Sequence, residues 1–540
     1  MITRGIGIGG LLLFTGLRLA IAAPPAEPGL PPAEPGLQVE HYGLQVSFDA
    51  VAQTISGVSV LTLSWERSPQ GRLTVDMADS LSARAVRLDG KPVGYEHQGS
   101  KLLVTLPPAL STGREHVLEV SYGGKPNPRY LHFHTVAGEP AIASYGLPFS
   151  AMGWWPTLDE PLFKAAGADV ILTAPQGTMA ISNGTLIGTE YLPDGRRRFH
   201  WRERSPIYPD VISATIGPYD IIDARYRSES GRTIALHYYV YPADKARAEP
   251  EFAAVPDILR VYESLFGPYP FAREKYGIAE VPFPSFREHQ TVPSLGRDLI
   301  LGTAEAWDLH SVGNVIAHDM AHQWFGDSLT PRRWSDVWLN EAFANYAVAL
   351  WHERRGGEAA YRRFMRSLDA GSFSGSVYIA PDRPAEELLT YVTFNKGAWV
   401  LHMLRHIMGD ERFFAALHGY VQANSGGLVD TGTWRAACEH AYGQSLGWFF
   451  AEWVYGQGRP ALRMSWNAIP QTGGFQSHVT IEQTQAGQVF TMPVDVEWTG
   501  AGRSGRQTVW LRQRRQDFTL STPAAPSRVI LDPDHWLLRN

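Results

Sequence analysis

Two histidines near the middle of this 540-residue chain have the spacing of metal ligands. His318 and His322 are four positions apart, so on an α-helix their side chains lie on the same face, about one turn apart. Glu341 follows them in an apolar, helix-like stretch. Two imidazoles and one carboxylate, with a fourth position left for water, form the ligand set of a catalytic zinc site. The sequence therefore predicts one Zn²⁺ bound by these three residues.

A histidine pair is weak evidence by itself, because the chain has 18 histidines. His402 and His406 repeat the spacing without a carboxylate pattern, and we expect them to be ordinary helix-face histidines. Glu341 distinguishes the first pair, because it is the only Asp, Glu, Lys or Arg between Asp336 and Glu353 and a buried carboxylate needs a partner. The alternative is a glutamate hydrogen-bonded to backbone or to an arginine. Nitrogen ligands favour Zn²⁺ over Mg²⁺ or Ca²⁺, which prefer oxygen.

The composition is that of a folded globular chain, with 44% hydrophobic and 19% charged residues. The net charge is -6, and no run of lysine or arginine forms a basic stripe. Nucleic acids and anionic membranes are therefore not expected partners. A peptide or a small amide substrate fits better, and the sequence indicates no oligomeric state.

The N-terminus has the features of an export signal. Within residues 1–23, Arg4 precedes an apolar stretch from Gly5 to Leu17 and a small-residue segment, Ala20-Ile21-Ala22. The apolar stretch is too short to span a bilayer, so no transmembrane segment is expected after cleavage; an uncleaved anchor is the alternative. We expect export to a bacterial periplasm or the extracellular medium. The only cysteine is Cys438, which excludes an intrachain disulfide.

Sequence patterns divide the rest of the chain into a tether and three domains. Residues 24–37 repeat Pro-Pro-Ala-Glu-Pro-Gly-Leu and are predicted to be an extended tether. Short alternating runs over residues 38–223 predict an N-terminal β domain, and renewed alternation over 460–540 predicts a β-sandwich. Residues 224–459 are mostly helical and contain the zinc candidate. The helices are predicted over Val255–Phe266, Val312–Phe325, Ser335–Arg355, Ala359–Leu368, Lys396–Met408, Glu411–Ala423 and Thr433–Val454.

Several motifs in a fixed order point to one family. They are Trp155-Pro156-Thr157-Leu158-Asp159-Glu160-Pro161, Ser182-Asn183-Gly184, Phe266-Gly267-Pro268-Tyr269-Pro270, Gln323-Trp324-Phe325-Gly326, Trp338-Leu339-Asn340-Glu341, Lys396-Gly397-Ala398 and Leu531-Asp532-Pro533. With the spacing from His322 to Glu341, they make the chain resemble the zinc aminopeptidases of the alanyl aminopeptidase and leukotriene hydrolase type, which are gluzincin metallopeptidases. The resemblance covers about residues 38 to 540.

The resemblance implies a multidomain α+β fold with a saddle-shaped N-terminal β domain, a thermolysin-like zinc domain and a C-terminal β-sandwich. It also implies that the N-terminal residue of a peptide is removed. In that family a glutamate takes a proton from the attacking water, a tyrosine donates to the oxyanion, and a Gly-x-Met-Glu-Asn strand binds the free amine. That strand becomes Ser285-Phe286-Arg287-Glu288-His289 here, which retains the amine-binding carboxylate as Glu288.

Two proton-handling positions depart from the family pattern. Asp319 stands at the general-base position, one methylene shorter than glutamate, which withdraws the carboxylate by roughly 1.5 Å if the helix does not move. Phe394 stands where the family has its catalytic tyrosine, and loss of one oxyanion donor typically costs ~10²–10³-fold in rate. Tyr391 and His289 are the alternative donors.

These departures leave three functional hypotheses. The first is a zinc aminopeptidase of reduced or altered activity, with Asp319 as base and Glu288 as amine ligand. The second is a catalytically silent relative whose zinc-centred cleft binds peptides or a partner protein. The third is hydrolysis of a more reactive, non-peptide amide or ester. The sequence does not indicate a side-chain preference.

Overall fold

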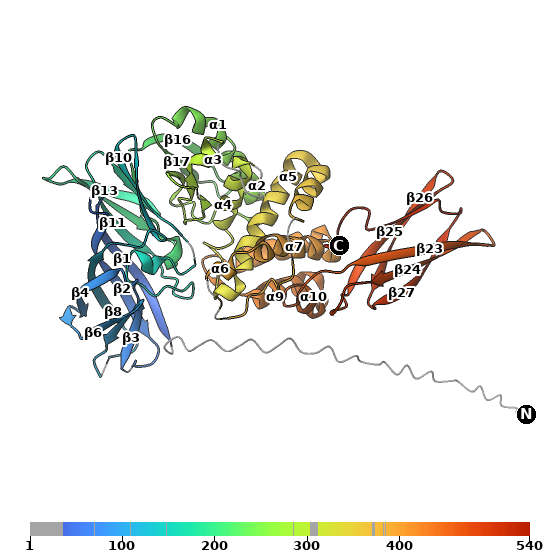
Figure 1. Ribbon diagram of the computed structural model, residues 1–540, viewed down its shortest axis with the longest axis horizontal. Coiled ribbons are helices and arrows are strands. Elements are labelled where there is room, and N and C mark those ends of the chain that lie inside the picture. The colour runs from blue at the N-terminus through green and yellow to red at the C-terminus, as the bar shows by residue number, and fades with distance from the viewer. Residues whose placement is uncertain are drawn as a thin grey trace, which may run out of the picture.

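The structure is a computed structural model that describes residues 36–69, 71–108, 110–146, 148–284, 286–302, 311–369, 373–381, 383 and 385–540. The predicted signal peptide and nearly all of the predicted tether lie outside these residues. Figure 1 shows a β-rich region, a helical region and a second β region side by side, in chain order. The predicted multidomain α+β fold is confirmed. None of the described helices combines the length and apolar character needed to cross a membrane.

The N-terminal region consists of three sheets. The largest has the strand order β13-β14-β11-β1-β2-β8-β4-β5, in which β1 and β11 run parallel and the other neighbours are antiparallel. Its strands are β1 (Leu37–Asp49), β2 (Thr54–Trp65), β4 (Leu81–Leu88), β5 (Lys91–Pro92), β8 (His116–Gly124), β11 (Ala168–Ala174), β13 (Thr185–Tyr191) and β14 (Arg197–Glu203). Because Leu37 already belongs to β1, the predicted tether ends before it.

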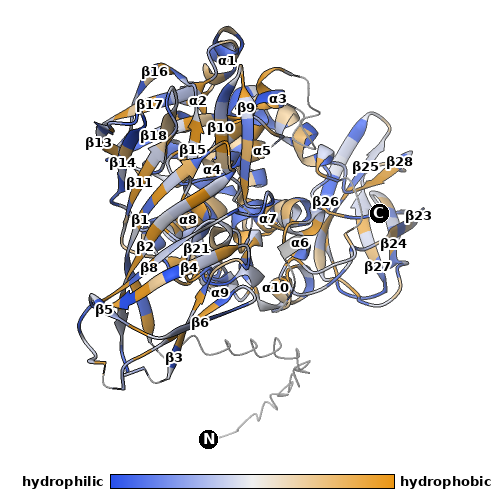
Figure 2. Cartoon of the chain, turned by 60° about the vertical axis from the view of Figure 1, so that its left-hand side comes forward, coloured by the Kyte–Doolittle hydropathy of each residue, from blue (hydrophilic) through white to orange (hydrophobic). Residues whose placement is uncertain are grey.

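Two smaller sheets complete this region. One has the order β12-β15-β10-β9 and the other β3-β7-β6. Their strands are β3 (Arg72–Asp76), β6 (Tyr95–Gln98), β7 (Lys101–Thr105), β9 (Leu131–Val136), β10 (Glu139–Ser144), β12 (Met179–Ile181) and β15 (Thr215–Gly217). Hydrophobic and hydrophilic residues alternate along the strands of the large sheet (Figure 2), as expected for strands with one buried face.

The central region combines a five-stranded sheet with helices. The sheet order is β16-β17-β18-β20-β19, so β19 is an edge strand. Its strands are β16 (Asp220–Arg227), β17 (Thr233–Val240), β18 (Lys275–Val281), β19 (Phe286–Arg287) and β20 (Ser294–Gly296). The expected boundary after Asp223 falls inside β16, because pairing with β17 begins at Asp220.

The helices follow the predicted apolar periodicity. They are α1 (Lys245–Phe252), α2 (Val255–Phe266), α3 (Arg297–Ile300), α4 (Val312–His322), α5 (Trp338–Ser367), α6 (Ala385–Leu388), α7 (Gly397–Met408), α8 (Asp410–Asn424), α9 (Thr431–Tyr442) and α10 (Gly447–Trp453). Helix α5 has a non-helical break at Gly357, with φ 68°, between the two helices predicted there. The single helix predicted over Thr433–Val454 is wrong, because Gly443 adopts left-handed φ of 76° and ends α9.

The C-terminal region consists of two three-stranded sheets. Their orders are β23-β24-β27 and β26-β25-β28, and buried residues of both sheets belong to one core. The strands are β23 (Leu462–Gln471), β24 (Gly474–Gln483), β25 (Met492–Gly500), β26 (Arg503–Leu511), β27 (Arg515–Thr522) and β28 (Arg528–Leu531). This is the predicted sandwich.

The second histidine pair binds the C-terminal tail to α7. The ring of Trp536 stacks on His402 and on His406, with centroid distances of 4.5 and 4.7 Å. Nδ1 of His402 lies 2.6 Å from the hydroxyl of Tyr361, and Nε2 lies 3.1 Å from the backbone oxygen of His535. Both histidines therefore have packing roles, as predicted.

We expect His402 to make the fold sensitive to acid. Burial lowers its pKa to about 3, whereas the unfolded chain has the ordinary value near 6.5. Between these values the unfolded state binds more protons, so the free energy of unfolding falls as the pH decreases below about 6.5, by about 2 kcal/mol at pH 5. His402→Gln should lose this part of the acid sensitivity. Urea unfolding at pH 7.5 and 5.0, followed by tryptophan fluorescence, measures it.

His440→Gln is the control, because His440 is exposed and should leave the acid sensitivity unchanged. Equal pH dependence of wild type and His402→Gln would contradict the prediction.

Candidate metal centre and substrate cleft

The structure brings the three predicted ligands together. His318 and His322 lie on α4, and Glu341 lies in the first turn of α5. The two Nε2 atoms are 3.0 Å apart, and each is 3.5 Å from Oε2 of Glu341. Tetrahedral ligands at zinc–ligand distances of about 2.0–2.1 Å are separated by about 3.3–3.4 Å, so the spacing fits Zn²⁺. Within the described residues, these three form the only such group of metal-ligating side chains.

Hydrogen bonds at the other ring nitrogens orient both histidines. Nδ1 of His318 lies 2.9 Å from Oδ1 of Asn345, and Nδ1 of His322 lies 3.1 Å from the backbone oxygen of Phe325. Both partners are acceptors, so each Nδ1 donates its proton and each Nε2 is left with a lone pair. Two lone pairs and a carboxylate oxygen then converge in a buried space. This donor set fits a cation and would be unfavourable without one.

The general-base candidate lies beside the ligands and is fully enclosed. Asp319 is 3% exposed, and its Oδ1 has no hydrogen-bond partner among the described residues. Burial raises the pKa of Asp319 well above its usual value, and the nearby negative charge of Glu288 raises it further. The carboxylate of Asp319 is thus shielded from solvent next to the two candidate histidine ligands on α4.

Aromatic rings close the space around His318. Phe394 stacks on His318 with a centroid distance of 6.0 Å and an interplanar angle of 15°. Phe286 meets the same ring edge-on at 6.1 Å. Phe394, at the sequence position of the family's catalytic tyrosine, therefore lies beside the candidate metal centre. Its side chain is a hydrocarbon ring without a hydroxyl group.

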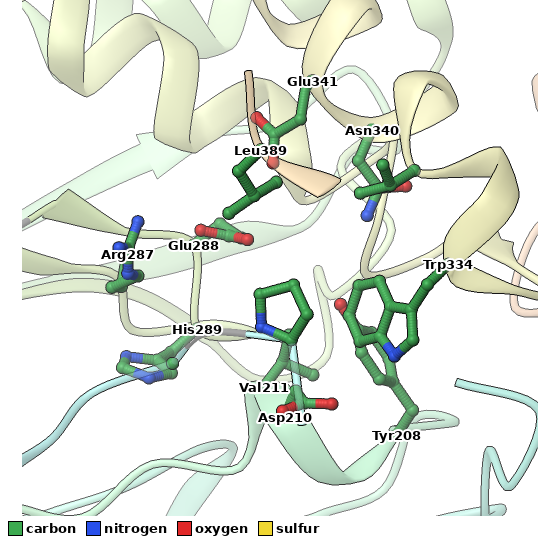
Figure 3. A pocket seen from close by; sticks show the side chains of 13 residues that line it. Tyr208, Asp210, Val211, Arg287, Glu288, His289, Trp334, Asn340, Glu341 and Leu389 are labelled. Carbon is green, nitrogen blue, oxygen red and sulfur yellow. The ribbon is translucent and has the colours of Figure 1, made fainter. Parts of the chain in front are cut away.

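A cleft between the N-terminal β region and the zinc-site helices leads to Glu341 (Figure 3). The cleft is narrow, with about 20 Å³ of space that water-sized groups can occupy. The β region supplies part of the wall and the zinc region supplies the rest. The lining residues are Gly146, Pro148, Tyr208, Asp210, Val211, Arg287, Glu288, His289, Trp334, Val337, Asn340, Glu341 and Leu389.

The two predicted alternative donors differ in location. Tyr391 is 52% exposed and is absent from the described lining of the cleft, which gives no support to its assignment. His289 is 1% exposed and lines the cleft, with Nδ1 3.1 Å from Oγ of Ser294 and Nε2 without a partner among the described residues. Burial lowers the pKa of His289 to about 3, so the ring is neutral near pH 7.

Sequence reasoning missed Tyr208, which lines the cleft from the β region. Its ring is buried beside that of Trp334, at a centroid distance of 6.4 Å. In Figure 3 the Tyr208 hydroxyl points toward the interior of the cleft. Tyr208 is far from α4 in the sequence and has no motif around it, so only the packing of the two regions reveals it.

The segment after Glu288 is held by both regions. Thr291 has φ 64°, which is unfavourable for a β-branched residue. Its backbone N–H donates to Oε1 of Gln323 at 2.8 Å, and its Oγ1 accepts from the N–H of Gly184 at 2.8 Å. Nδ2 of Asn183 donates to the backbone oxygen of Gln290 at 2.6 Å. The Ser182-Asn183-Gly184 motif thus positions the segment that carries Glu288.

Comparison with known proteins finds a family model that matches part of the central region. Residues 260–453 match the model of the peptidase family M1 domain. The chain is 25% identical over 476 residues to a probable aminopeptidase 1 of Sulfurisphaera tokodaii, covering 84% of this chain and 57% of that protein. It is 26% identical over 377 residues to the human endoplasmic reticulum aminopeptidase 1, covering 65% and 39%. The chain spans about half the length of the curated relatives it matches.

Solved structures show the same architecture. An M1 zinc metallopeptidase mutant from Deinococcus radiodurans, bound to a Tyr-Ser-Ala substrate, superposes with a TM-score of 0.68 at 27% identity, covering 79% of this chain and 96% of that one. Legionella pneumophila aminopeptidase A superposes with a TM-score of 0.82, covering 94% and 60%, and at 17% identity this likeness concerns the fold alone.

We expect Asn345→Ala to weaken zinc binding about 10- to 100-fold, because it removes the acceptor that orients His318. Competition with a chromogenic chelator measures the affinity. Asn395→Ala is the matched control. Asn395 accepts a hydrogen bond from Asn345, but the described hydrogen bonds include none between Asn395 and His318. Wild-type zinc affinity in Asn345→Ala would show that this contact does not support the metal site.

Proposed function

We propose that this chain, whose central region is a peptidase family M1 domain, is an exported zinc aminopeptidase that removes N-terminal residues from peptides. The observation that carries the proposal is the grouping of the His318, His322 and Glu341 ligand atoms within 4.8 Å of one another at the end of a cleft that also contains Glu288. One zinc ion per chain fits this donor set.

Each side chain has a role in the proposed reaction. A zinc ion held by the three ligands supplies a Lewis acid for the scissile carbonyl. Asp319 accepts the proton of the attacking water, and Glu288 binds the substrate ammonium group through a charge-assisted hydrogen bond. The enclosed position of Asp319 keeps bulk water from its carboxylate. Aspartate reaches less far than glutamate, so we propose reduced or altered activity.

Tyr208 is the proposed proton donor to the oxyanion. It is the described tyrosine that lines the cleft, whereas Phe394 has no proton to donate and Tyr391 is largely exposed. Its phenol is buried, and burial raises its pKa well above the usual value, so the hydroxyl stays protonated near pH 7. A protonated phenol can donate a hydrogen bond where negative charge develops.

A catalytically silent relative that binds peptides or a partner protein is the second candidate. The contact of Phe394 with His318 favours it, because by resemblance Phe394 stands at the sequence position of the family's catalytic tyrosine and has no hydroxyl group. A silent chain could retain its ligands for a structural purpose. Export, the remaining part of the proposal, is supported by the signal-like residues 1–23.

The deciding experiment is hydrolysis of a panel of aminoacyl amides by the mature, zinc-loaded protein. We expect measurable activity that is lost in His318→Ala and falls at least ~10²-fold in Asp319→Asn, because the base is removed. Asp319→Glu and Phe394→Tyr test whether the two departures reduce the rate. If activity appears only when both are introduced together, with zinc bound throughout, the chain is a silent relative and the proposal is wrong.

Tyr208→Phe should lower kcat about 10²–10³-fold with little change in KM, if its hydroxyl acts only in the transition state. Tyr391→Phe is the matched control and should retain wild-type kinetics. A normal rate in Tyr208→Phe, combined with a loss in Tyr391→Phe, would reverse the assignment. Steady-state kinetics on the best substrate of the panel gives both constants.

A further inference from the structure

Arg287 is the only lysine or arginine in the described lining of the cleft. A guanidinium has five N–H groups. Nη1 donates to the backbone oxygen of Phe286 at 3.1 Å, and Nη2 donates to the hydroxyl of Tyr145 at 2.8 Å. Nε is enclosed and has no partner, and the described residues offer this side chain no ion pair with a carboxylate. The second N–H of Nη1 and the second N–H of Nη2 are therefore available to a ligand.

The guanidinium is held in place by a row of rings. It lies 4.5 Å from the centroid of the Tyr145 ring, and Tyr145 packs beside Phe283 at 5.8 Å. His132, on β9, stacks on Phe283 at 4.2 Å and meets the Tyr145 ring edge-on at 5.5 Å. Little side-chain entropy is lost when a group so fixed binds a ligand, which favours specific recognition over a loose surface contact.

The acidic groups of the cleft have other roles. Glu341 faces the two histidines of the metal centre, and Glu288 is the proposed ligand of the substrate amine. Oδ1 of Asp210 accepts from the backbone N–H of Ser150 at 3.0 Å and from its hydroxyl at 3.3 Å. With the acidic lining residues assigned to these roles, none of them is left as a counter-charge for Arg287.

Arg287 and Phe286 have different contacts on opposite sides of their strand. Successive residues of a strand point to opposite faces. Phe286 contacts His318, whereas Arg287 contacts Tyr145 in the N-terminal β region. Figure 3 shows Arg287 beside Glu288 at one end of the cleft, with Tyr208 and Trp334 at the other. A substrate whose amine is bound by Glu288 and whose carbonyl faces the metal directs its first side chain into the remaining space of the cleft.

We propose that Arg287 binds the side-chain carboxylate of an N-terminal aspartate or glutamate, so that the cleft selects peptides that begin with an acidic residue. The guanidinium presents pairs of parallel N–H groups, which match the two oxygens of a carboxylate. This inference rests on the proposed function in one respect: Glu288 anchors the substrate amine.

Binding without turnover tests the proposal separately from catalysis. The probes are the α-hydroxamates of glutamic acid, glutamine and leucine, titrated into the mature, zinc-loaded protein by calorimetry. The glutamic acid and glutamine probes have the same length and differ in charge. We expect the wild-type protein to bind the glutamic acid probe at least about tenfold more tightly than the glutamine probe.

Arg287→Gln should reduce this ratio to about threefold or less, because glutamine can still donate to Tyr145 but carries no charge. Arg287→Lys, which keeps the charge and loses the planar fork, should retain a smaller preference and serves if Arg287→Gln does not fold. Arg512→Gln, a remote exposed arginine, should keep the wild-type ratio. Zinc content and thermal unfolding are compared for every variant.

The outcomes separate the two proposals. Equal binding of the two probes by wild type, an unchanged ratio in Arg287→Gln, or no binding of any probe would overturn the role of Arg287. A clear preference for the acidic probe in a protein that hydrolyses no aminoacyl amide would support acidic recognition and contradict the enzymatic function. Hydrolysis of many amides without an acidic preference would contradict the role of Arg287 alone.

Discussion

The centre of this protein depends on two imidazole lone pairs and a carboxylate oxygen that face one another in a buried space. Such groups repel or remain unpaired unless a cation lies between them. Helix α4 supplies both histidines through one-turn spacing, and α5 supplies Glu341 from its first turn. Asn345 and the backbone of Phe325 fix the ring nitrogens that point away. A cation bound by these groups would therefore add coordination geometry to the apolar packing that holds α5 against α4.

The N-terminal β region takes part in the site as well as flanking it. Asn183 and Gly184 hold the turn that follows Glu288. In the same contact, Nζ of Lys275 in the central region donates to the backbone oxygens of Ser182 and Gly184 in the β region. Lys164 similarly donates to backbone oxygens just after α4. Burial lowers the pKa of each lysine to about 7, which reflects the free-energy cost of removing a charged amine from water. Apolar residues at the interface would avoid this cost. These buried amines define one relative position of the two regions.

The departures from the family pattern surround an unchanged set of ligands. Asp319 shortens the base, Phe394 removes a hydroxyl group, and Arg287 adds a positive charge at the cleft wall. Phe394 contacts His318, Asp319 follows His318 on α4, and Arg287 lines the cleft that leads to Glu341. Altered chemistry and altered recognition can therefore be parts of one change. The likeness to solved M1 zinc metallopeptidases extends across both regions that form the cleft.

Local patterns in the sequence indicated the candidate metal ligands, the order of β, helical and β regions, and most helices, because helical spacing and strand alternation depend on neighbouring residues. They also indicated Asp319, Phe394 and Glu288 through the resemblance. They could not distinguish the break at Gly443 from a continuous helix, nor place Tyr391 outside the cleft. The cleft wall was decided by tertiary structure alone. Tyr208 and the Tyr145 contact of Arg287 come from a region separated from α4 by a hundred residues or more. Only the docking of that region onto the helices of the candidate metal centre brings them to the cleft.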